Sequence, residues 1–149
     1  MAEFGGDGSV EVAVARGRCF EVAAAVAAYP DWHPVIKSMT PLAQDADGRA
    51  SHARAVVDAS VSTVTVEVGF SYSEPSRVEC RRQSGDLSRM WTTFEFVELE
   101  SGLTRVDYAT SLDPGRMLSM LARGPVIEKV RTKLVDDALA GFKRVAESG

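Results

Sequence analysis

The chain lacks the features that mark several classes of protein. Its N-terminus has no basic region followed by an apolar stretch, and no run approaches the ~18 apolar residues that cross a bilayer. We therefore expect a cytoplasmic protein without stable membrane insertion. Cysteine is scarce, because only Cys19 and Cys80 occur, without paired spacing or a neighbouring histidine. This argues against zinc and predicts two small, buried, reduced side chains.

An excess of positive charge is also absent. The chain has 17 Lys and Arg against 21 Asp and Glu, which gives a net charge of −4 and argues against nonspecific binding to nucleic acid. No nucleophile elbow, phosphate-binding loop, dinucleotide fingerprint or metal motif occurs, and His33 and His52 are too far apart in sequence to suggest a metal site. We expect neither a cofactor nor a bound metal.

What the chain does have is ordinary globular composition. Its 149 residues predict one domain, with an ordered core over about 9–147. A chain of this length buries about two-thirds of its unfolded surface, so it needs no disulfide or metal for stability.

Two stretches have helical patterns. An alanine-rich segment, 19–28, favours a short helix, although Arg16-Gly17-Arg18 before it is a poor cap. A longer segment, about 125–147, repeats apolar residues at four-residue spacing, which predicts an amphipathic helix of roughly 34 Å. Its apolar stripe is Val126, Val130, Leu134, Ala138 and Phe142.

Alternating apolar and polar residues predict seven short strands, most of them joined as consecutive hairpins. The first three cover 9–15, 35–42 and 51–59. The clearest, 62–72, places Val64, Val66, Val68, Phe70 and Tyr72 on one face. The inward positions of the last three are Val78 and Cys80; Met90, Thr92, Phe94 and Phe96; and Val106, Tyr108, Thr110 and Leu112.

The strand 51–59 differs because its inward side chains are small, namely Ala53, Ala55, Val57 and Ala59. We expect them to leave space opposite Val130, Leu134 and Ala138 of the long helix.

One segment, Ala28-Tyr29-Pro30-Asp31-Trp32-His33-Pro34, separates the first helix from the strands. Together with Val56-Val57-Asp58-Ala59, Phe94-Glu95-Phe96 and Val126-Ile127-Glu128-Lys129-Val130, it makes the chain similar to the START/Bet v 1-like (SRPBCC) superfamily, and within it to the bacterial polyketide cyclase/dehydrase family. The resemblance implies an α+β helix-grip fold. In that fold a seven-stranded curved antiparallel sheet surrounds a long C-terminal helix, two short helices lie between strands 1 and 2, and a cavity lies inside.

The predicted cavity combines apolar walls with a few hydroxyl groups, which is typical of ligand sites. These hydroxyl groups either orient a ligand or form hydrogen bonds with neighbouring groups of the protein. They belong to Tyr72, Thr92, Tyr108 and Thr110. The full predicted set is Trp32, Ala55, Val57, Val66, Val68, Phe70, Tyr72, Thr92, Phe94, Tyr108, Thr110, Met117, Leu121, Leu134 and Ala138. Met117 and Leu121 belong to a segment between Gly115 and Gly124 that is either a movable lid or part of the core.

The resemblance also implies which residue a catalytic cavity would contain, because the related aromatase/cyclases carry an arginine that points into the cavity. Here the alternation places Arg54 and His52 outside, and Arg82 in the inward phase but near a strand end. Trp32 either caps the cavity mouth or packs beneath its loop, and His33 is either an acid or base or simply exposed. The orientation of Trp91 stays open, and no catalytic residue is assigned.

Three functions remain open. The first is binding of a small hydrophobic molecule (a lipid, quinone or polyketide-like compound) as a carrier or sensor, with a homodimer possible. The second is polyketide aromatase/cyclase or dehydrase activity. The third is an interaction module for a ribosomal or respiratory partner. Fold alone does not decide among them. Charged residues confined to the rim favour the first function over the second.

Overall fold

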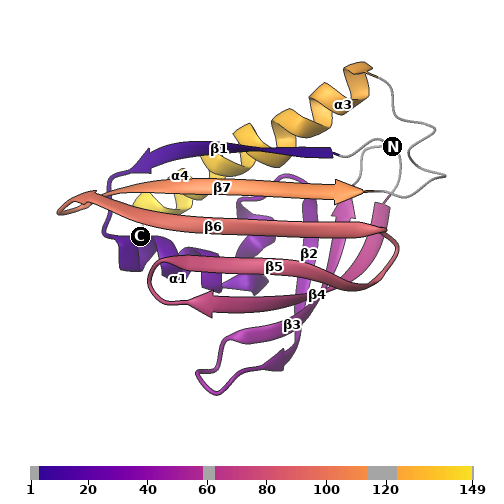
Figure 1. Cartoon of the computed structure of the whole chain (residues 1–149), viewed down its shortest axis with the longest axis horizontal. Helices are drawn as coiled ribbons and strands as arrows, with labels where there is room; N and C mark the ends of the chain where they lie inside the picture. The colour runs from indigo at the N-terminus through magenta and orange to yellow at the C-terminus, as the bar shows by residue number, and fades with distance from the viewer. Residues whose placement is uncertain (1–3, 59–62, 114–123, 149) are drawn as a thin grey trace.

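Strand order in the sheet follows the chain almost throughout. The computed structural model describes residues 4–58, 63–113 and 124–148. In this part of the chain one antiparallel sheet has the order β1-β7-β6-β5-β4-β3-β2 (Figure 1). Its strands are β1 (Phe4–Val12), β2 (Ile36–Gln44), β3 (Ala50–Asp58), β4 (Thr63–Ser73), β5 (Arg77–Gly85), β6 (Arg89–Glu100) and β7 (Leu103–Asp113).

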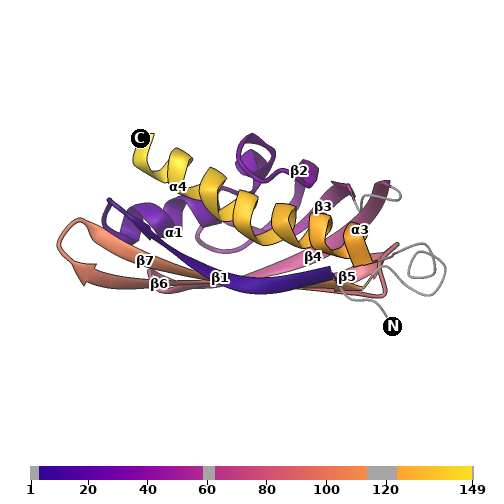
Figure 2. The same cartoon turned by 90° about the horizontal axis from the view of Figure 1, so that it is seen from above.

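Helices cover one face of this sheet. The short helices α1 (Arg16–Ala24) and η1 (Val26–Asp31) lie between β1 and β2, and η1 is a 3-10 helix. The C-terminal helix consists of α3 (Gly124–Arg131), a π-helical segment η2 (Thr132–Asp137) and α4 (Ala138–Ser148). It crosses the sheet on the same side as α1 (Figure 2). The predicted helix-grip architecture is thereby confirmed.

Several predicted boundaries were wrong by a few residues. β1 spans Phe4–Val12 rather than 9–15, because Gly5, Gly6 and Gly8 pair with β7 despite their low strand propensity. The first helix begins at Arg16 and ends at Ala24, after which the chain continues as a 3-10 turn up to Asp31. No side chain caps its N-terminus, which agrees with the weak capping residues there.

Burial follows the predicted alternation. In β4 the buried positions are Val64, Val66, Val68 and Phe70, and in β7 they are Thr104, Val106, Tyr108, Thr110 and Leu112, followed by Asp113. The long helix buries Val130, Leu134, Ala138 and Phe142 as expected, and also Val135 and Leu139. Gly8 of β1 makes room for Val135 and Leu139, since a Cβ on Gly8 would lie 3.1 Å from side-chain atoms of each. A glycine in β1 therefore lets the π-helical turn approach closely.

Candidate functional site

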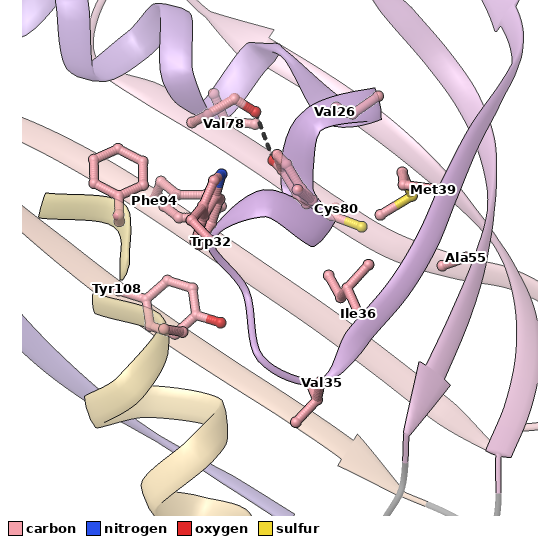
Figure 3. Close-up of a cluster of buried hydrophobic side chains, with 14 of the residues drawn as sticks. Val26, Trp32, Val35, Ile36, Met39, Ala55, Val78, Cys80, Phe94 and Tyr108 are labelled. Atoms are coloured by element: carbon pink, nitrogen blue, oxygen red, sulfur yellow. Dashed lines mark hydrogen bonds between the residues drawn. The ribbon is translucent and has the colours of Figure 1, made fainter. Parts of the chain in front are cut away.

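An internal cavity lies between the concave face of the sheet and the long helix. The space open to the centre of a water molecule is about 20 Å³, enough for one or two waters. Its wall consists of Tyr29, His33, Val35, Ile36, Met39, Val57, Cys80, Met90, Thr92, Phe94, Thr110, Leu112 and Leu134. Figure 3 shows Ile36, Met39 and Cys80 on one side of this region and Phe94 beside Trp32 on the other.

Five of the residues predicted to form the cavity border it in this structure: Val57, Thr92, Phe94, Thr110 and Leu134. Seven others are buried in the surrounding core without bordering it: Trp32, Ala55, Val66, Val68, Phe70, Tyr108 and Ala138. Tyr72 is half-buried, and its hydroxyl donates to the Ala50 carbonyl at 2.6 Å. Met117, Leu121 and Ala59 lie outside the described residues, as does the predicted lid up to residue 123.

The position of Met39 explains why the small side chains of β3 do not themselves leave an open space. Met39 lies directly opposite Ala55 in the β2–β3 register, and its side chain borders the cavity. A register shift between Ile36 and Ser38 gives β2 an irregular burial pattern, in which Ile36 and Met39 are buried. Simple alternation therefore could not find Met39, whereas Cys80, Met90 and Leu112 were already in the inward phase of their strands.

His33 is buried, which excludes the alternative of an exposed histidine. It is 6% exposed, and its Nε2 lies 3.1 Å from the Tyr108 hydroxyl. Its Nδ1 accepts a long bond of 3.4 Å from the Val35 amide, an arrangement that places the proton on Nε2. Burial lowers the pKa of His33 from 6.5 to about 4, which keeps the ring neutral at pH 7. The sequence signal for this burial was weak, because Tyr108 is far away in the chain.

Two threonines form a second polar group in the same wall. Thr92 and Thr110 lie opposite each other in the β6–β7 register, with their hydroxyl oxygens 2.9 Å apart. Thr110 also donates to the Trp91 carbonyl at 3.3 Å. Burial raises the pKa of the Tyr108 phenol well above its usual value, so this group also stays neutral. Tyr108 and Thr110 lie two residues apart on the inner face of β7, which places the pair His33–Tyr108 next to the pair Thr110–Thr92. We call these four residues the polar row below.

Trp32 packs inside the core rather than over an open cavity mouth. Its ring centroid lies 5.1 Å from that of Tyr29 and 5.3 Å from that of Phe142, and it also contacts Phe94 (Figure 3). Gly141 allows the backbone of the long helix to approach this loop, because a Cβ on it would lie 2.1 Å from the Trp32 carbonyl oxygen. The helix and the loop therefore meet backbone to backbone.

The basic residues considered in the sequence lie away from the cavity. Arg82 is half-buried and donates to the Gly85 carbonyl at 2.8 Å. Arg54 and His52 both lie beside Glu67 on the outer face, and the His52 Nε2 to Glu67 oxygen distance is 3.0 Å. Trp91 is half-buried on that outer face, paired with Arg81 and Ser111. Among the described wall residues, none is Lys or Arg.

Two kinds of feature are absent from the described residues. No three His, Cys, Asp or Glu side chains in this part of the chain gather closely enough to hold a metal ion. Across the same residues, no helix is long and apolar enough to span a bilayer.

Comparison with known proteins agrees with this architecture. The family model described as polyketide cyclase / dehydrase and lipid transport matches residues 6–147. This match covers nearly the whole chain and defines its class. The chain belongs to the polyketide cyclase/dehydrase family. No curated protein matches it.

Solved structures show the same fold at low sequence identity. A START superfamily protein from Mycobacterium smegmatis is 22% identical, with a TM-score of 0.80 over 95% of this chain and 96% of that one. A protein from Thermus thermophilus is 17% identical, with a TM-score of 0.79 over 99% of this chain and 98% of that one. The Zhui aromatase/cyclase from a Streptomyces species is 16% identical, with a TM-score of 0.73 over 98% and 94%.

Proposed function

We propose that this protein binds a small hydrophobic molecule in its internal cavity and acts as a carrier or sensor. The observation that carries the proposal is the cavity wall, which is apolar except for the polar groups of four side chains, those of Tyr29, His33, Thr92 and Thr110. Such a combination is typical of small-molecule sites. Membership of a family described as polyketide cyclase / dehydrase and lipid transport supports the same function.

The cavity among the described residues is small, and binding of a larger ligand therefore requires the wall to move. Sites for drug-sized molecules have volumes of roughly 300–1,000 Å³, far above the 20 Å³ found here. Met39 and Met90 both border the cavity. Methionine side chains have three rotatable bonds and adapt readily to new shapes. Their repacking, together with movement of the irregular edge strand β2, would enlarge the cavity without unfolding the sheet.

Titration with the apolar fluorophore N-phenylnaphthylamine tests this function. We expect saturable one-site binding in the micromolar range, roughly −8 kcal/mol. Val57→Phe should weaken binding because Val57 borders the cavity. Val56→Phe is the matched control, since Val56 is the next residue of β3 and its side chain lies on the opposite face. Binding that does not saturate, or that both variants weaken equally, would contradict the proposal.

Aromatase/cyclase or dehydrase activity is the second candidate. The observation in its favour is the neutral imidazole of His33 in the cavity wall. Its Nδ1 carries the ring's lone pair and can accept a proton once it gives up the long bond from the Val35 amide. The pKa of His33, lowered to about 4 by burial, makes it a weak base at neutral pH, and we therefore place binding first. Incubation with a poly-β-ketone tests the activity. Ring formation that is lost in His33→Gln would reverse this ranking, and no turnover would leave the binding function in first place.

A further inference from the structure

We propose that the cavity selects a neutral apolar molecule with one hydrogen-bonding oxygen, such as a phenol, an alcohol or a ketone. The polar row of His33, Tyr108, Thr110 and Thr92 would recognise that oxygen. A hydrocarbon of the same shape and a carboxylate of the same shape should both bind more weakly. This inference rests on the proposed function and adds the chemical class of the ligand.

The placement of the two threonines is the first support. Thr92 and Thr110 border the cavity from adjacent strands, and both are buried. The inward positions of β4, by contrast, are Val64, Val66 and Val68, which have nearly the same shape without a hydroxyl. A buried hydroxyl costs free energy unless it is hydrogen-bonded. Valines would therefore serve the core equally well, and the two hydroxyls are surplus to packing.

Hydroxyl groups can also accommodate a further partner. Each threonine hydroxyl has one proton to donate and two lone pairs to accept with. The bond between Thr92 and Thr110 uses one donor and one acceptor, and the Thr110 bond to the Trp91 carbonyl is long at 3.3 Å. Rotation of either hydroxyl can present a donor or an acceptor to the cavity. A ligand alcohol and a ligand ketone therefore both fit the same pair.

His33 fixes the other end of the polar row. Its Nδ1 accepts from the Val35 amide, so Nε2 donates to the Tyr108 oxygen. The Tyr108 proton is then free for another partner, and Thr110 lies two residues further along the same face of β7. The row is thus ordered by the backbone of the loop before β2, and its threonine end faces the cavity.

The charge of the wall disfavours an anionic ligand. His33 is neutral at pH 7, and among the described wall residues there is no Lys or Arg to pair with a carboxylate. A carboxylate moved into such a site loses its hydration without gaining an opposite charge. The cavity should therefore reject carboxylates more strongly than it rejects hydrocarbons.

Four compounds with one ring system separate these preferences: naphthol, acetonaphthone, methylnaphthalene and naphthoate, each displacing N-phenylnaphthylamine at pH 7. We expect naphthol and acetonaphthone to bind about tenfold more tightly than methylnaphthalene, which is the effect of one net hydrogen bond. Naphthoate should bind most weakly. Equal binding of methylnaphthalene, tightest binding of naphthoate, or failure of all four to displace a bound fluorophore would overturn the inference and leave the proposed function standing. No binding of the fluorophore itself would overturn both.

Variants locate the preference in the polar row. Thr92→Val combined with Thr110→Val should reduce the preference for naphthol over methylnaphthalene from about tenfold to less than about twofold, with methylnaphthalene binding unchanged. Thr93→Val makes the same chemical change on the opposite face of β6 and should leave the preference intact. If the double variant does not fold, Thr92→Val alone should lose most of the preference. An unchanged preference in the double variant, or in Thr92→Val alone, would overturn the inference.

Discussion

The aromatic cluster around Phe142 and the cavity beside Leu134 occupy one face of the same sheet, yet they are filled differently. Phe142 is fully buried, and its ring centroid lies within 6.2 Å of those of Trp32, Phe94 and Phe96. Phe94 and Tyr29 border the cavity too, but most of its wall is aliphatic or sulfur-containing, with Ile36, Met39, Cys80 and Met90 among its residues. Rigid rings fix the first region, whereas flexible side chains leave the second able to change shape.

The strands that border the cavity differ in regularity. β6 and β7 pair without interruption, from Arg89 opposite Asp113 to Glu98 opposite Thr104. The pairing of β2 with β3, in contrast, has three register shifts. β2 is also an edge strand, so only one strand pairs with it. The aromatic side therefore anchors the fold, and the β2 side can move to admit a ligand.

The largest effect should come from removing the centre of the aromatic cluster. Phe142→Ala should lower the free energy of unfolding by about 3–5 kcal/mol, because the packed rings around it cannot close the space left. Leu134→Ala is the comparison on the cavity side, where about 2 kcal/mol is expected since the wall can collapse. Chemical denaturation measures both. Equal losses would show that the two regions are equally rigid.

Acid should destabilise the protein through His33. The unfolded chain binds a proton at this residue below pH 6.5, whereas the folded protein does so only below about pH 4. The unfolded state binds more protons between these values, so stability falls as pH decreases from 6.5 to 4, by about 3 kcal/mol in total. His33→Gln should lack this component in denaturation midpoints measured across that window. An identical pH dependence in both proteins would mean that folding does not lower the pKa of His33.

The contact between helix and loop predicts a matched pair of glycine substitutions. Gly141→Ala places a methyl group 2.1 Å from the Trp32 carbonyl oxygen. It should destabilise the fold by about 2 kcal/mol, despite the higher helix propensity of alanine. Gly17→Ala, in α1, meets nothing within 4 Å and should stabilise by about 0.5–1 kcal/mol. Thermal unfolding distinguishes the two, and stabilisation by Gly141→Ala would contradict the close approach.

The smallest effect concerns the two cysteines. Burial raises the pKa of Cys19 to about 11 and of Cys80 to about 12, so both should react slowly with a thiol reagent at pH 7. Cys80 borders the cavity and Cys19 does not. Saturation with a ligand should slow labelling of Cys80 severalfold and leave Cys19 unchanged, as followed by peptide mass spectrometry. Equal slowing at both sites would indicate global stabilisation rather than occupation of the cavity.

The sequence determined the fold more completely than the site, for identifiable reasons. Alternation in β4 to β7 specified which side chains face inward, and the four-residue stripe specified the helix. The burial of His33 depends on Tyr108, a partner distant in the chain, and the inward position of Met39 depends on a register shift. Neither has a local periodic signal. The π-helical turn likewise depends on Gly8 of β1, which on local propensity is a poor strand residue.

Methyl NMR during titration with naphthol tests the central claim most directly, namely that a ligand enters on the β2 side while the aromatic cluster stays fixed. Met39 and Met90 border the cavity, and Ala146 and Val12 are buried outside its wall. We expect saturable shifts of the Met39 and Met90 methyl signals, with those of Ala146 and Val12 nearly unchanged. Shifts of similar size at all four residues, or no shift at the two methionines while naphthol binds, would contradict the account.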